Sequence, residues 1–125
     1  SAKQMPKEHY IFQPTSKIRS FGKLLAHIAE SVFEMTAIAK GEIVPVSKVP
    51  SNKVEVIKAL EKAFAYAAKA RETMTKEQKE RLVMFNGSSQ AAGNVLDFIT
   101  FHSLQHYGNI IVYMRLKDLI PPSSQ

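Results

Sequence analysis

The sequence predicts an all-α protein in which helices run up and down in a bundle. Three segments repeat apolar residues with the 3.6-residue period of an amphipathic helix, and capping or stop signals bound each of them. Only the short run over residues 81–85 resembles the alternation of a strand. The connections between the three segments have ordinary loop lengths, which favours antiparallel packing of neighbouring helices.

The first helix is expected to begin at Thr15 or Ser16, both of which are good N-cap residues, and to end at Gly41. Its apolar stripe consists of Ile18, Phe21, Leu25, Ile28, Val32, Met35 and Ala39. Residues 1–14 contain two prolines and no helical period, so we expect them to form an extended arm.

The second helix is expected to open at Asn52, because Glu55 follows three residues later as in a capping box. Its alanine-rich face permits close helix packing and consists of Ala63, Ala67 and Ala70. A short helical turn should follow from Thr75, with Gln78 three residues later, to about residue 82.

The last long helix is expected over residues 90–117, after a break at Asn86-Gly87-Ser88-Ser89 and before a stop at Pro121-Pro122. Three long helices are an awkward number, because an up-down bundle usually has four. We therefore expect that residues 1–125 lack the usual first helix. Either it lies upstream of Ser1, or another chain covers the open face.

Composition narrows the function classes. With 125 residues and 45% hydrophobic residues, the chain is expected to form one domain over residues 1–125. The net charge of +6 is spread along the chain without a basic cluster, which argues against nucleic-acid binding. No apolar run approaches the roughly 20 residues of a membrane span. The absence of cysteine excludes disulfides, thiolate metal ligands and a cysteine nucleophile, but it fits any compartment, so the localisation is left open.

The strongest functional signal is a set of three histidines. His102 and His106 are four residues apart on the inward face of the last helix, and His27 lies at the edge of the apolar stripe of the first helix. Three imidazoles from two helices would bind a divalent metal ion and leave a coordination position open. The alternative is a pair of hydrogen-bonded core histidines, and the spacing alone does not choose between them.

Polar residues near the histidines could orient the imidazoles. Glu30 and Glu34 lie one and two turns after His27, and Gln105 and Asn109 flank the pair on the last helix. Metal-bound imidazoles commonly donate their second N–H to such acceptors, so we expect Glu34 and Asn109 to serve in this way. The alternative is that all four are simply exposed polar residues.

Several motifs in order resemble the DinB/YfiT-like family over residues 5–124. They are Phe12-Gln-Pro-Thr15, Arg19-Ser-Phe-Gly-Lys-Leu-Leu-Ala-His27, His102-Ser-Leu-Gln-His106-Tyr-Gly-Asn and Ile120-Pro-Pro-Ser-Ser124. The resemblance implies a four-helix bundle, often a homodimer, in which three histidines hold a divalent metal ion such as zinc or nickel. By motif position these ligands would be His27, His102 and His106.

The resemblance also implies candidate activities. One is a metal-dependent thiol transferase or hydrolase, acting on a small molecule and in the first case using a low-molecular-weight thiol. The alternative is a non-catalytic metal-binding or assembly domain with structural histidines. One departure is that the family frequently has Arg-Gly-Gln where this chain has Tyr107-Gly108-Asn109, which argues against a cationic clamp at that position.

Overall fold

The computed structural model describes residues 1–44 and 47–125. In chain order its elements are η1 (Lys7–His9), α1 (Phe21–Lys40), α2 (Lys53–Thr73), α3 (Lys76–Glu80), β1 (Leu82–Phe85), β2 (Ser88–Ala91), α4 (Ala92–Arg115) and η2 (Pro122–Ser124). The predicted all-α class is confirmed, and a small two-stranded hairpin is added to it. None of the described helices is long and apolar enough to cross a membrane.

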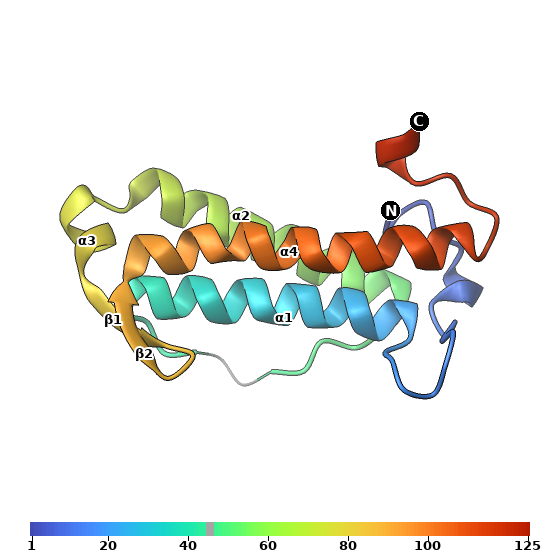
Figure 1. Cartoon of the computed structure of the whole chain (residues 1–125), viewed down its shortest axis with the longest axis horizontal. Helices are drawn as coiled ribbons and strands as arrows, with labels where there is room; N and C mark the ends of the chain where they lie inside the picture. The colour runs from blue at the N-terminus through green and yellow to red at the C-terminus, as the bar shows by residue number, and fades with distance from the viewer. Residues whose placement is uncertain (45–46) are drawn as a thin grey trace.

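The helix α1 is the centre of the bundle, because it packs against both α2 and α4. Figure 1 shows α1 and α4 side by side, with α2 passing behind them. The two termini lie at one end of the bundle, and α3 and the hairpin lie at the other end (Figure 1). The core consists mainly of apolar side chains on the facing sides of these three long helices.

The close packing of α1 and α2 depends on small side chains. The predicted alanine face of α2 is buried, with Ala63, Ala67 and Ala70 each no more than 3% exposed. On α1, Ala26 and Ala29 are also buried. Small side chains let two helix backbones approach closely, and this brings the larger apolar residues of α1 into contact with both neighbours.

The helix α1 begins later than the sequence indicated. Its N-cap is Ser20, whose hydroxyl accepts from the Lys23 N–H at 3.3 Å, rather than Thr15 or Ser16. The N–H groups of the first two helical residues, Phe21 and Gly22, have no acceptor within the helix. They donate to the carbonyls of Phe12 and Tyr10, respectively, each at 2.8 Å. Because the preceding segment folds back to satisfy these donors, the helix cannot extend to residue 16.

The expected extended arm over residues 1–14 is instead folded against the bundle. It contains the 3-10 turn η1, and its Met5 and Tyr10 side chains are buried. The Tyr10 hydroxyl donates to the Ala2 carbonyl at 2.6 Å, and the Tyr10 ring packs edge-on against Phe21. Aromatic burial therefore fixes a segment that has no periodic pattern of its own.

Of the four residues predicted as a break, Asn86 and Gly87 form the turn of a hairpin, and Ser88 and Ser89 begin its second strand, β2. The strands pair antiparallel from Leu82 opposite Ala91 to Phe85 opposite Ser88. Asn86 and Gly87 between them both have positive φ, of 50° and 77°. An Asn-Gly pair is suited to such a two-residue turn, which matches the twist of the strands it joins. The hairpin packs on α4 through the Phe85 and Phe98 rings.

The remaining boundaries follow the predicted capping signals closely. Gly41 ends α1 in the left-handed conformation, with φ of 71°. The Asn52 side chain caps α2 by accepting from the Glu55 N–H at 3.1 Å. Thr75 and Gln78 form a reciprocal capping box on α3. The predicted last helix is also confirmed, although it begins two residues later and ends two residues earlier than expected.

Two glycines provide a matched test of this packing. A Cβ atom at Gly22 would lie 2.1 Å from the Ser51 carbonyl oxygen, whereas a Cβ at Gly108 would meet nothing within 4 Å. Gly22→Ala should therefore lower the free energy of unfolding by at least about 2 kcal/mol, because backbone has to move. Gly108→Ala should raise it by about 0.5–1 kcal/mol, because glycine is unfavourable within a helix. Urea denaturation of both variants measures this, and equal stabilities would contradict the packing at Gly22.

Candidate metal centre

Three histidine side chains from two helices meet at one point. One nitrogen from each of His27, His102 and His106 lies within 4.8 Å of the other two, and all three residues are half-buried. The His102 and His106 Nε2 atoms are 3.2 Å apart. The His27 ring lies 5.4 Å from the His102 ring and 4.9 Å from the His106 ring, between centroids. The predicted convergence of these histidines is therefore present.

The packing of α1 against α4 creates this meeting point. His27 lies at the edge of the buried face of α1, next to the buried Ala26 and Ile28. His102 and His106 are one turn apart on the side of α4 that faces α1, with the Phe98 ring 6.1 Å from His102. The four-residue spacing therefore places His102 and His106 together on α4, and the contact between α1 and α4 brings His27 to them.

Burial holds the three imidazoles in the neutral form. Burial is the main cause that lowers the pKa of His27 to about 4, and the positive charge of Arg19 contributes. The same two causes lower the pKa of His102, and burial, His102 and Arg19 lower that of His106. Neutral imidazoles each offer a lone pair, which is the form that binds a metal ion.

The donor set fits a divalent transition metal. Two nitrogens bound to one tetrahedral ion at about 2.1 Å lie about 3.4 Å from each other, close to the His102–His106 separation. The group contains three nitrogen donors and no carboxylate, which suits zinc or nickel and not calcium or magnesium. In addition, the Nδ1 atoms of His102 and His106 are buried and have no hydrogen-bond partner among the described residues.

The expected supporting residues lie elsewhere or make no bond. Glu34 is exposed and lines a cavity with Val49 and Lys62, and no hydrogen bond joins it to an imidazole in residues 1–44 and 47–125. Two turns of helix separate it from His27, a rise of about 10 Å. Asn109 is exposed and lines a cavity beside His106, and within the described residues no hydrogen bond joins it to the His106 ring. The nearer carboxylate, Glu30, accepts from the Val49 N–H at 2.9 Å.

Sequence reasoning did not single out Arg19 as a residue of the site. It lies just before α1, and it lines a cavity of about 650 Å³ together with His106, Asn109 and Tyr113. The Tyr113 hydroxyl donates to the Arg19 carbonyl at 2.5 Å. No spacing rule relates residue 19 to residue 106, so only the folded position of the preceding segment reveals this neighbour.

The neutral state of His27 predicts a pH dependence in metal-free protein. Between pH 6.5 and about 4 the unfolded chain binds a proton at His27 that the folded chain does not bind, so stability falls as the pH falls through this window. His27→Gln should therefore lose less stability than the wild type between pH 7 and pH 5. Urea denaturation in the presence of a chelator measures this difference. An equal loss in both proteins would show that burial of His27 does not contribute.

A family model and two solved structures that resemble this chain all carry the same family description. The chain matches the DinB superfamily model over residues 1–110. It is similar in structure to a DinB-like protein from Bacillus subtilis, YjoA, with a TM-score of 0.77 and 19% identity over 99% of this chain and 88% of that chain. A DinB-like protein from Bacillus cereus has the same TM-score, with 17% identity over 97% of this chain and 83% of that chain.

These two structural likenesses show a shared fold. No curated protein sequence matches the chain. The family model covers most of the sequence, including all three histidines, and the fold agrees with it. The chain belongs to the DinB superfamily.

Proposed function

We propose that this chain binds a divalent metal ion, zinc or nickel, through His27, His102 and His106. We further propose that it acts as a metal-dependent thiol transferase or hydrolase on a small molecule. A low-molecular-weight thiol would be the second substrate of the transferase. The observation that carries the proposal is the convergence of three neutral imidazoles within 4.8 Å of one another, with no carboxylate among them.

The arrangement suits chemistry at a metal ion that is only partly enclosed. A divalent ion bound by three neutral imidazoles lowers the pKa of a water or thiol and so supplies a nucleophile near neutral pH. The histidines would hold the ion between α1 and α4, both of which are anchored in the core. The cavity beside His106 gives a small molecule access to the same point.

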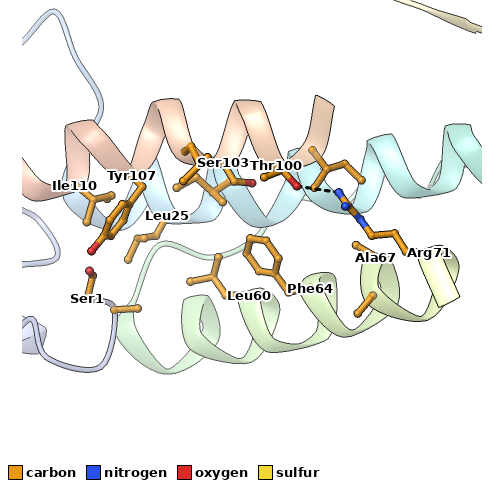
Figure 2. A pocket seen from close by; sticks show the side chains of 15 residues that line it. Ser1, Leu25, Leu60, Phe64, Ala67, Arg71, Thr100, Ser103, Tyr107 and Ile110 are labelled. Atoms are coloured by element: carbon orange, nitrogen blue, oxygen red, sulfur yellow. Dashed lines mark hydrogen bonds between the residues drawn. The ribbon is translucent and has the colours of Figure 1, made fainter. Parts of the chain in front are cut away.

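The second candidate is a non-catalytic assembly domain in which the histidines bind metal only structurally. An apolar groove of about 520 Å³ on another side of α4 favours an assembly role. Figure 2 shows its walls, with Leu60 and Phe64 of α2 facing Ser103 and Tyr107 of α4. A metal ion that stays bound to untagged protein through purification would favour the first candidate. Metal-free protein whose stability a chelator leaves unchanged would favour the second, because an ion bound only to the folded chain stabilises it.

In either case we propose that the groove is filled by a second copy of this chain. Phe64 is 42% exposed on one wall of the groove, and Leu104 is 63% exposed on the opposite wall. Among the described residues that line the groove, Arg71 has the one charged side chain, and it donates to the Leu96 carbonyl and to Thr100. The other side chains that line the groove carry no charge, so two copies of a chain with net charge +6 would bring mainly apolar surface together here. A two-fold axis would place the same apolar patch on both sides.

Substituting one histidine tests the metal centre. His106→Ala should reduce zinc and nickel affinity at least about 100-fold, because it removes a direct ligand, while the protein stays folded. His9→Ala is the matched control, since His9 lies in η1 outside the cluster and should keep the wild-type affinity. Isothermal titration of untagged protein measures both. Equal affinity and stoichiometry in the two variants would exclude His106 as a ligand.

Substituting one leucine tests the dimer. The wild type should have twice the 14.0 kDa mass of one chain in size-exclusion chromatography with light scattering. Leu104→Glu should convert it to a monomer, because a carboxylate cannot be buried in the groove without a partner. Leu82→Glu is the control, since Leu82 is similarly exposed, at 68%, but lies on β1 away from the groove. A wild-type monomer, or a Leu104→Glu dimer, would contradict this interface.

A further inference from the structure

The cavity beside His106 has an unusual distribution of charge. Three of its lining residues are cationic, namely Lys17, Arg19 and Lys23, and none is acidic. None of these three forms a salt bridge with a carboxylate in the part of the chain that the structure describes. The remaining polar lining residues are neutral, namely Gln13, Ser16, His106, Asn109 and Tyr113. The walls therefore present positive charge and neutral polar groups toward the same space.

The position of Arg19 is fixed by the fold although its side chain is exposed. Its carbonyl accepts from the Tyr113 hydroxyl at 2.5 Å, and the next residue, Ser20, caps α1. The Phe12 ring packs edge-on against Tyr113 at 6.0 Å between centroids. These contacts tie the backbone of the segment 12–20 to α4, next to the histidines. A guanidinium on such a fixed backbone can bind an oxyanion through two parallel hydrogen bonds.

We propose that the substrate of this protein carries an oxyanion group, a carboxylate or a phosphate, which docks on Arg19 in the cavity beside His106. The inference rests on the proposed function, because it names the substrate class of that same site. Lys17 and Lys23 add to the positive potential, and Asn109 and Ser16 offer hydrogen bonds.

A charge argument supports this assignment. Arg19 is near enough to the cluster that its charge acts on all three imidazoles. A divalent ion bound there by neutral ligands would add two further positive charges to a region that already holds three cations. An anionic ligand between them would provide the missing counter-charge, with an attraction that solvent at the exposed Arg19 side chain partly screens.

The test uses metal-free protein, so that its outcome does not depend on metal binding. Inorganic phosphate and succinate are titrated separately into ¹⁵N-labelled full-length chain, with sodium chloride at the same ionic strength as the reference. We expect saturable shifts of the backbone amides of Arg19, Lys23 and Asn109 beyond those caused by chloride. Tighter binding of succinate would assign a carboxylate substrate, and tighter binding of phosphate a phosphorylated one.

Matched variants identify the residue. Arg19→Gln should weaken binding about tenfold, because it removes a charge-assisted bidentate contact. Arg115→Gln is the control, since Arg115 is also exposed and its guanidinium bonds to Ser124 outside the cavity. The proposal would be overturned if phosphate and succinate shifted the amides no more than chloride does. It would also be overturned if the two variants weakened anion binding equally. Anion binding without any zinc or nickel binding would leave this site standing and refute only the metal centre.

Discussion

The contact between α1 and its two neighbours determines the rest of this structure. α1 must be covered on two sides, by α2 through an alanine face and by α4 through larger apolar residues. The burial of these surfaces supplies the main driving force for folding, since burying apolar area is favourable by roughly 25 cal/mol per Å². Only this packing brings residue 27 to residues 102 and 106, which are distant in sequence. The N-terminal segment then depends on it, because Tyr10 and Phe12 pack against the start of α1 and the end of α4.

Local signals in the sequence predicted much of this arrangement. Helical periodicity located the three long helices. The capping residues Gly41 and Asn52 marked the end of α1 and the start of α2, and Thr75 marked the start of the short helix α3. The i, i+4 spacing placed His102 and His106 on one face, because the geometry of a helix is set by the backbone alone. These features depend on neighbours within a few residues, so a single sequence contains the information for them.

Other features depend on contacts that no local pattern encodes. Thr15, Ser16 and Ser20 are all competent N-caps, and the choice of Ser20 follows from carbonyls of Tyr10 and Phe12 that only the folded segment brings into reach. Arg19 joins the site for the same reason. The hairpin is a different case, since Asn86-Gly87 is itself a strong turn signal and was interpreted only as the end of one helix and the start of another. The expectation for Glu34 used the angle around the helix, which places residues 27 and 34 on one face. It did not use the rise of about 10 Å along the helix axis that separates them.

The two surfaces of α4 share the same two turns of helix. His102 and His106 face α1, while their immediate neighbours Ser103 and Tyr107 line the apolar groove. An insertion or deletion of one residue in this stretch would rotate the helix by about 100° and displace both surfaces together. Substitutions can change either face singly, but changes in length cannot. The evolution of this stretch is therefore confined to residue replacement, and sequence length here should be far less variable than in the loop between α1 and α2.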